Sequence, residues 1–262
     1  MERKASHYTP IIMYNEGVFQ QKEDEIAIEK PITIYVNDEE FATLVCTPLH
    51  IEELVVGFLA SEGIIFFASD IQSLELDEER GFAYVLLNKT LSTDPTFFTK
   101  RVIGSCCGKS RQFYFQNDAR TAKTSTSQMT ITAEQCLSLM GEMHKKSEVF
   151  SRTGGVHNAA LCSVDEIMLT RSDIGRHNAL DKLYGFCLYE RINLRDKVLV
   201  FSGRISSEIL TKAAKIGVGI VLSKSAPTDL AIKLAEDLNI TAVGFIRSHS
   251  FNVYSHPFRV LL

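Results

Sequence analysis

The stretch KVLVFSGRISSEILTKAAKIGVGIVLSKSAPTDLAIKLAEDLNITAVGFI, residues 197–246, decides the fold of the C-terminal half of the chain. Three short apolar runs alternate in it with two amphipathic segments, at 197–201, 206–216, 218–222, 228–238 and 240–246. This alternation predicts strands separated by helices in a β-α-β-α-β order. Because strands joined by helical crossovers run parallel, we expect a layered α/β domain built on parallel strands.

The residues before this stretch extend the same domain. Thr132-Ala133-Glu134-Gln135 is a capping-box pattern that predicts a helix through about residue 146. The runs 159–163 and 167–171 indicate two strands joined by a short turn. A further helix is predicted where apolar residues recur at helical spacing, at Leu180, Leu183, Tyr184, Cys187 and Leu188.

The N-terminal half has a mixed pattern. The β-runs 32–36 and 41–45 flank four polar residues and predict a hairpin, and 82–87 is strand-like. A helix is expected over 51–61, because Gly63 lies just past it, where left-handed backbone is favoured.

Composition and charge set the broad class of the protein. Of 262 residues, 45% are hydrophobic and 23% charged, the balance of an ordinary folded chain. The formal net charge of −4 excludes a globally basic nucleic-acid binder.

The chain divides into two parts. We expect a mixed α+β part, residues 1–130, and an α/β domain, residues 131–262. The first 30 residues are polar and predict an irregular arm or an edge strand.

The N-terminus and the most apolar segment indicate a cytoplasmic protein. Residues 1–17 contain basic side chains but no continuous apolar stretch, so they do not read as a signal peptide. The segment 54–68 carries Ser61, Glu62 and Gly63 in its middle and is too short to span a bilayer. We therefore expect reduced thiols and no membrane partner.

Six cysteines occur, two of them adjacent, at Cys46, Cys106, Cys107, Cys136, Cys162 and Cys187. They form no C-x-x-C pair and no zinc-finger spacing, so a structural zinc site is not expected. His50-Ile51-Glu52 matches half of a zinc-deaminase signature, but its P-C-x-x-C half is absent from the sequence. Most of these cysteines are therefore expected to be small buried hydrophobic residues.

The segment Gly104-Ser105-Cys106-Cys107-Gly108-Lys109 is the first candidate for chemistry, because it lies in a polar stretch rich in Lys and Arg. Nearby cations stabilise a thiolate, and the thiolate is the nucleophile. Flanking glycines let the backbone turn and keep the sulfur accessible. The pattern indicates a cysteine that attacks, or that carries sulfur as a persulfide. The alternative is a solvated basic loop with two incidental cysteines.

A second candidate is a repeated motif. Gly-x-His-Asn-Ala occurs at 155–159 and again at 175–179, so that His157 and His177 each follow a glycine-containing turn. Neutral histidine accepts a proton from a hydroxyl or thiol near neutral pH. The alternative is that each Asn or His caps an adjacent element.

A third candidate is the set of polar residues at the predicted strand ends. Ser202-Gly203-Arg204 follows one strand and opens a helix, which is an anion-binding geometry. Residues 225–228 follow the next strand in the same way, and Arg247 follows the last. Since ligands bind at the carboxyl ends of strands in open α/β sheets, we expect these groups to converge on one phosphorylated ligand. Taken alone, Ser202-Gly203-Arg204 is equally typical of an ordinary strand-to-helix turn with a serine cap.

Together these segments resemble the FdhD/NarQ family. The resemblance covers nearly the whole chain beyond residue 30, in the family's order, at 46–48, 53–59, 105–109, 153–157, 173–182, 202–204, 225–228, 244–247 and 251–254. It implies a sulfurtransferase that accepts a persulfide from a cysteine desulfurase. The sulfur then passes to the molybdenum cofactor, in its bis-guanine-dinucleotide form, before that cofactor is inserted into apo formate dehydrogenase. The resemblance also implies a homodimer and a zinc-free cytidine-deaminase-like fold for the C-terminal part.

The resemblance also implies roles for particular residues. The family's cofactor-binding segment matches Phe245, Ile246, Arg247, Ser248, His249 and Ser250, to which we add Ser202, Gly203, Arg204 and His177. Well-known members carry C-x-x-C in the cysteine loop, whereas the two cysteines are adjacent here. We assign the persulfide to Cys107, because Gly108 and Lys109 follow it as in the family, with Cys106 as helper or alternative.

Two other functions remain open from the residues alone. One is a chaperone that binds the mature cofactor and docks on the apoenzyme without sulfur chemistry. The other is a redox or metal sensor that uses the adjacent thiols.

Overall fold

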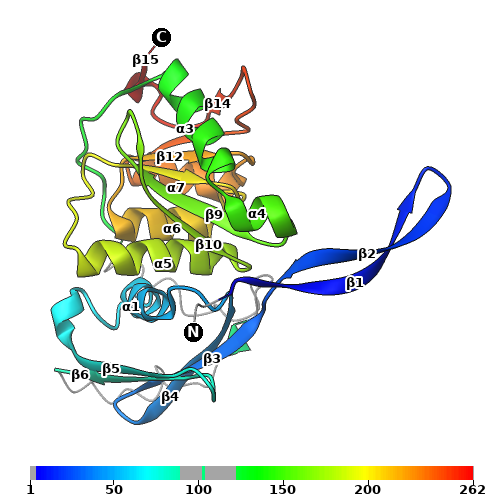
Figure 1. Cartoon of the computed structure of the whole chain (residues 1–262). Helices are drawn as coiled ribbons and strands as arrows, with labels where there is room; N and C mark the ends of the chain where they lie inside the picture. The colour runs from blue at the N-terminus through cyan, green and yellow to red at the C-terminus, as the bar shows by residue number, and fades with distance from the viewer. Residues whose placement is uncertain (1–3, 89–101, 104–121, 262) are drawn as a thin grey trace.

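The computed structural model describes residues 4–88, 102–103 and 122–261. A layered upper part lies above a smaller lower part, and a long two-stranded arm projects beside them (Figure 1). Within the described residues, no helix is long and apolar enough to cross a lipid bilayer.

The upper part is built on a six-stranded mixed sheet. Its strand order is β10 (Ile167–Asp173), β9 (His157–Cys162), β11 (Val198–Phe201), β12 (Ile220–Ser223), β13 (Thr241–Gly244) and β14 (Asn252–Val253). The three strands β11, β12 and β13 pair in parallel, and β9 with β10 forms an antiparallel hairpin. The α/β class predicted from residues 197–246 is therefore confirmed.

Helices cover both faces of this sheet. The helices α5 (Arg176–Tyr189), α6 (Ser207–Ile216) and α7 (Asp229–Asp237) pack on one face, where Leu199 and Phe201 point. On the other face, α3 (Ala133–Lys145) packs against Val198 and Val200, the alternate residues of the same strand. Alternation of side chains thus divides one apolar run between two cores.

The predicted helix starts are present. The Thr132 hydroxyl accepts a hydrogen bond from the Gln135 N–H, and the Gln135 side chain accepts one from the Thr132 N–H, which is the predicted capping box. Ser206 and Thr228 cap α6 and α7 in the same way, with one hydroxyl each. The six-residue helix α4 (Glu148–Thr153) was not predicted, because it is too short for a periodic signal.

The lower part is a five-stranded sheet covered by α1 (Ile51–Ser61). Its order is β5 (Ile71–Asp77), β6 (Phe82–Leu87), β3 (Lys30–Val36), β4 (Glu39–Cys46) and β7 (Val102–Ile103). The predicted hairpin β3–β4 is confirmed, with left-handed φ values of 49° and 67° at Asn37 and Asp38. Strand β5 escaped prediction because a register shift between Ile71 and Ser73 interrupts its alternation.

The two parts meet where α1 crosses α5. A Cβ atom on Gly57 would lie 1.8 Å from the Asp181 carbonyl oxygen, and one on Gly185 would lie 1.9 Å from that of Glu53. The two backbones therefore touch at a pair of glycines, a distance that no other residue type allows. This contact joins the lower part to the sheet above it (Figure 1).

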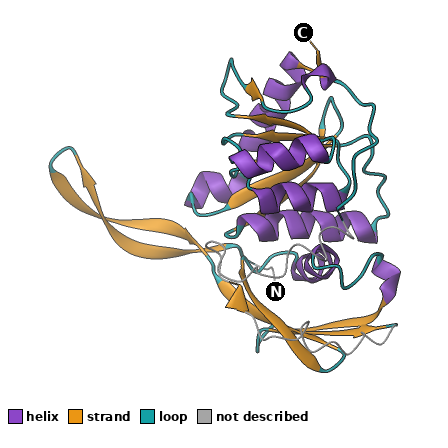
Figure 2. Cartoon of the chain, turned by 180° about the vertical axis from the view of Figure 1, so that it is seen from behind, coloured by secondary structure: helices purple, strands orange, loops and turns teal. Residues whose placement is uncertain are grey.

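The N-terminal segment differs from the irregular arm or edge strand that we predicted. It forms a regular antiparallel hairpin of β1 (Ser6–Asn15) and β2 (Val18–Ala27), turned at Glu16 and Gly17 with φ of 47° and 89°. Figure 2 shows this arm extending well away from both sheets. Its charged composition hid the strands, because the alternation that marks a half-buried strand is lost where neither face is buried.

Four short elements complete the described chain. Strands β8 (Ile131–Thr132) and β15 (Val260–Leu261) pair in parallel and tie the C-terminal end to the start of α3. Single 3₁₀ turns occupy Ala68–Asp70 and Pro257–Arg259.

Candidate functional site

A cavity of about 710 Å³ opens at the carboxyl ends of the parallel strands. This volume falls within the range of small-molecule sites, about 300–1,000 Å³. Helices α3 and α4, strand β9 and the segments that follow β10, β11, β12 and β13 enclose it. Its lining residues are Leu137, Met140, Gly141, Met143, His144, Ser147, Phe150, Gly154, Gly155, Val156, His157, Asn158, Ile174, Ser202, Lys224, Ile246, Arg247 and Ser248.

The cavity has a cationic side at the strand ends. Lys224 directly follows β12, and Arg247 lies just after β13. The Arg247 Nη1 donates to the Lys224 carbonyl at 2.6 Å, while its guanidinium stacks 4.1 Å from the centre of the Phe245 ring. No lining residue that the structure describes is acidic. The site therefore favours an anionic ligand.

The part of the lining that comes from α3 and α4 is mostly apolar, and it includes Met140, Met143 and Phe150. The His144 and Phe150 rings lie 5.8 Å apart between centroids at 56°. A cavity with both apolar and cationic lining suits a ligand that carries both a ring and phosphates.

His157 also lines the cavity, at the start of β9. Burial, together with the positive charge of Arg176, lowers the pKa of His157 below its ordinary value, so the imidazole is neutral near pH 7. Its Nδ1 lies 3.5 Å from the Ser202 hydroxyl, which accepts a hydrogen bond from the Asn158 N–H at 2.9 Å. The site thus holds a neutral imidazole beside a positioned hydroxyl.

The predicted ligand-binding residues divide into two groups. Ser202, Ile246, Arg247 and Ser248 line the cavity together. Gly203 does not line it but lies beside a lining residue, since a Cβ atom there would be 3.4 Å from His157 Nδ1 and 2.9 Å from the Phe201 ring. The remaining predicted residues do not line it, and they are Phe245, Arg204, His177, His249 and Ser250. Their binding role stays a prediction.

The repeated histidine motif has two different environments. His157 faces the cavity, whereas His177 lies on α5 with its Nε2 2.9 Å from the Glu208 carboxylate. Asn178 does not cap a helix, because its side-chain amide donates to Val45 and to Asp173. The first copy of the motif therefore lines the cavity, and the second contributes to the contact between the two parts.

Sequence reasoning missed part of the lining. Lys224 follows β12 just as Ser202 follows β11, so the strand-end rule that singled out Ser202 also applies to it. His144 and the methionines of α3 carried no comparable signal, because they lie on a helix that is distant in sequence from the strand ends. Phe150 carried none either, because it lies on α4, which was not predicted.

The cysteines also divide into two groups. Cys106 and Cys107 lie outside the described residues, in the segment that follows β7. The other four are buried, and burial raises the pKa of each thiol from 9 to about 12: Cys46, Cys136, Cys162 and Cys187. These four are small core residues, as predicted, and their thiols are unreactive at neutral pH.

Comparison with known proteins gives one consistent result. The model of the FdhD/NarQ family matches residues 27–261. A protein from Halalkalibacterium halodurans named sulfur carrier protein FdhD is 62% identical over 253 residues, covering 96% of this chain and 94% of its own length. The protein of the same name from Bacillus subtilis strain 168 is 58% identical, covering 99% of both chains.

A solved structure has the same fold. It is a crystal structure of a protein assigned as a formate dehydrogenase accessory protein from Desulfotalea psychrophila. The TM-score is 0.80 at 24% identity, covering 98% of this chain and all of the other. With the family match over most of its length and relatives well above half identical, this chain belongs to the FdhD/NarQ family.

Proposed function

We propose that this protein is a sulfur carrier that supports the maturation of formate dehydrogenase, with Cys107 as the persulfide-bearing residue and Cys106 as its helper. The observation that carries the proposal is the division of the thiols. Four are buried with pKa values raised to about 12, which leaves the two in the glycine-flanked basic segment for chemistry. The name of the relatives, sulfur carrier protein FdhD, supports the same role.

Sulfur loading is a thiol–persulfide exchange. The Cys107 thiolate attacks the terminal sulfur of a persulfide on a cysteine desulfurase, and the donor's sulfur–sulfur bond breaks. The products are a Cys107 persulfide and the donor's free thiolate, so atoms and electrons balance without another reactant. The lysines and arginines that flank the segment in sequence favour the attacking thiolate.

The substrate that receives the sulfur is the molybdenum cofactor in its bis-guanine-dinucleotide form. The residues of the cavity fit the nucleotide portion of this substrate. Lys224 and Arg247 supply positive charge for phosphates, and the Ser202 hydroxyl, which lines the same cavity, lies 3.5 Å from His157 Nδ1. The wall of α3 and α4 offers apolar surface for a ring. The protein would then act as a homodimer in the cytoplasm, as the family resemblance implies.

Mass spectrometry tests the sulfur step. Wild-type protein incubated with a cysteine desulfurase and cysteine is expected to gain about 32 Da per persulfide. Cys107→Ala is expected to lose this adduct and to fail to restore formate dehydrogenase activity in cells without a functional copy of this gene. Cys187→Ala, which removes a buried thiol, is the control and is expected to retain both. Full activity of Cys107→Ala would refute the assignment.

A chaperone that binds the cofactor without sulfur chemistry gives a different pattern. Guanosine diphosphate would bind in the cavity, and Arg247→Ala would weaken that binding, while no adduct would form on Cys106 or Cys107. A redox or metal sensor would instead bind a soft metal at the two thiols without any effect on cofactor loading.

A further inference from the structure

The contact between the two parts contains buried ion pairs, one of which reaches the cavity wall. The Lys182 ammonium lies 2.6 Å from the Asp173 carboxylate, and neither side chain is exposed to solvent. Asp173 ends β10, and the next residue, Ile174, lines the cavity. We propose that Asp173, Lys182 and Thr47 are positioning residues that hold the end of β4 against the cavity wall for sulfur delivery, an inference that rests on the sulfur-carrier function proposed above.

Thr47 has all three of its polar groups bonded to this short region. Its N–H donates to Asp173 Oδ2 at 3.0 Å, and its hydroxyl accepts from the Ile174 N–H at 3.1 Å. Its carbonyl accepts from the Lys182 ammonium at 2.9 Å. Thr47 is only 1% exposed, so these bonds are made away from water. The residue after β4 is therefore fixed to the end of β10 by two bonds and to α5 by a third.

Asp173 orients the cavity side of the same contact. Its Oδ1 accepts from the Gly175 N–H at 2.8 Å and from the Asn178 amide at 3.0 Å. In the β9–β10 ladder Asp173 pairs with His157, the neutral imidazole that faces the cavity. Two lining residues, His157 and Ile174, are thus the neighbours of Asp173, one across the ladder and one along the chain.

Strand pairing extends this contact toward the cysteine segment. Strands β4 and β7 run parallel, with Leu44 opposite Ile103. Their carboxyl ends therefore point to the same edge of the lower sheet, the edge where Thr47 lies. The contact at Thr47 joins the edge at which the chain leaves β7 to the wall of the cavity.

A second buried ion pair serves as the control that distinguishes a positioning role from a contribution to stability alone. Asp181 on α5 pairs with Lys212 on α6, and the Ser61 hydroxyl of α1 donates to Asp181 at 2.6 Å. This pair is buried at the same contact between the parts, but none of its residues lines the cavity. Buried ion pairs contribute little net stability relative to apolar packing. The difference between the two ion pairs is therefore their position, because only Asp173–Lys182 adjoins the cavity wall.

Matched hydroxyl deletions test the proposal. Thr47→Val keeps the side-chain volume but removes the bond from the Ile174 N–H, and Thr47→Ser retains that bond. Ser61→Ala removes the hydroxyl that donates to Asp181 in the second ion pair. Each variant is compared for thermal unfolding, persulfide mass after loading by a desulfurase, guanosine diphosphate binding, and formate dehydrogenase activity in cells without a functional copy of this gene.

For Thr47→Val we expect normal loading and nucleotide binding, but formate dehydrogenase activity lower by roughly 10- to 100-fold, with undischarged persulfide on the protein. Thr47→Ser is expected to recover activity, and Ser61→Ala to keep it. Equal activity in Thr47→Val and wild type, or equal losses in Thr47→Val and Ser61→Ala, would overturn the positioning role.

Two further results separate the outcomes. If Thr47→Val does not fold, the Asp173→Asn, Lys182→Met double variant is compared with Asp181→Asn, Lys212→Met, so that neither retains an unpaired buried charge. A loss of activity confined to the Asp173→Asn, Lys182→Met variant supports the proposal, and equal losses in both double variants overturn it. Absence of any adduct on the wild type would instead refute the sulfur-carrier function itself, and the positioning role with it.

Discussion

Substitution of Gly57 by alanine tests the joint between the two parts. The added Cβ atom would lie 1.8 Å from the Asp181 carbonyl oxygen and 2.8 Å from the Gly185 nitrogen. An ordinary van der Waals contact begins at 3.4 Å, so α1 and α5 would have to separate by about 1.6 Å. Backbone atoms on both sides leave no flexible side chain to yield.

The energetic cost of this separation is large for one methyl group. Overpacking of a rigid core costs about 1–3 kcal/mol, and contact with backbone places Gly57→Ala at the upper end, about 3 kcal/mol. For a chain of this size, that corresponds to a fall in Tm of roughly 6–12 °C. The hydrogen bonds at Thr47 depend on the same joint, so formate dehydrogenase activation is expected to fall as well.

Urea denaturation followed by circular dichroism measures the free energy of unfolding. Gly141→Ala is the matched control, because Gly141 lies within α3 and a Cβ atom there meets nothing within 4 Å. That variant is expected to gain about 0.5–1 kcal/mol, the usual helical preference for alanine. If the free energy of unfolding of Gly57→Ala lies within about 0.5 kcal/mol of that of the wild type, the contact between α1 and α5 is not as close as described.

Three other predictions follow from local features. Thr132→Ala should lower the free energy of unfolding by about 1 kcal/mol in urea titrations, because it removes the hydroxyl half of the α3 capping box, whereas an unchanged midpoint would contradict that role. Iodoacetamide at about pH 8 should label native protein only at Cys106 and Cys107. The four buried thiols, with pKa raised to about 12, are ionised to roughly one part in 10⁴ at that pH. Peptide mapping that finds label on a buried thiol would disprove this. The lowered pKa of His157 means that the unfolded chain takes up its proton first as the pH falls below about 6.5, so stability is greatest above that pH and declines below it. Urea midpoints between about pH 7.5 and 5.5 should fall less steeply in His157→Gln than in the wild type, and parallel curves would contradict the assignment.

Much of the fold was predictable from local chemistry. The helix predicted over 51–61 is α1, and Gly63 after it has a φ of 75°. The caps at Ser206 and Thr228 start helices where their hydroxyls predicted them. Each of these elements is specified by residues within a few positions of one another, which is the range over which sequence patterns operate.

The site was predictable where it follows strand ends and at the repeated histidine motif, which supplies His157. Ser202 and Arg247 reach one cavity because parallel strands bring their carboxyl ends to one edge. Phe150 and Ile174 reach it through the packing of α4 and the end of β10, which sequence spacing does not reveal. The bonds from Thr47 to Asp173 and Ile174 join residues more than 120 positions apart, and no local pattern encodes such a pairing.

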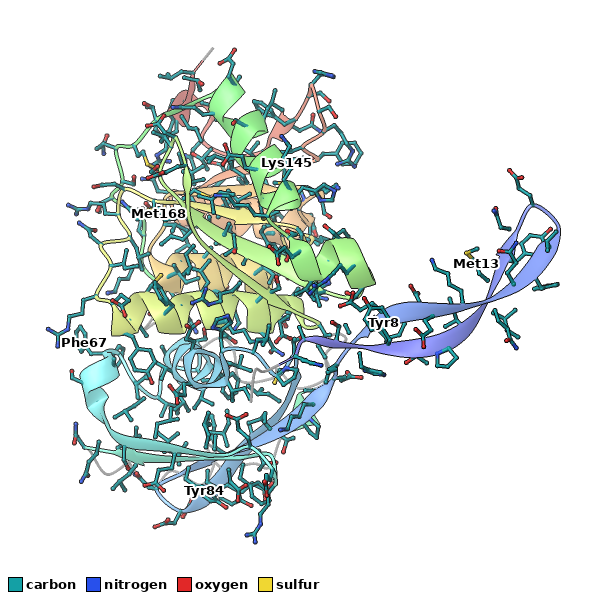
Figure 3. All side chains as sticks on the ribbon, viewed as in Figure 1. Tyr8, Met13, Phe67, Tyr84, Lys145 and Met168 are labelled. Atoms are coloured by element: carbon teal, nitrogen blue, oxygen red, sulfur yellow. The ribbon has the colours of Figure 1, made fainter. Side chains whose placement is uncertain are left out.

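The arm formed by β1 and β2 has a consequence for the protein's slow motions. Its side chains, Tyr8 and Met13 among them, extend along a ribbon that lies outside both sheets (Figure 3). Tyr8 is 67% and Phe19 73% exposed, and the arm's partners are almost all within the arm itself. A lone two-stranded ribbon is marginally stable in water. Amide hydrogens of the arm should therefore exchange with solvent through local opening, orders of magnitude faster than those of β11, which exchange only when the whole domain unfolds.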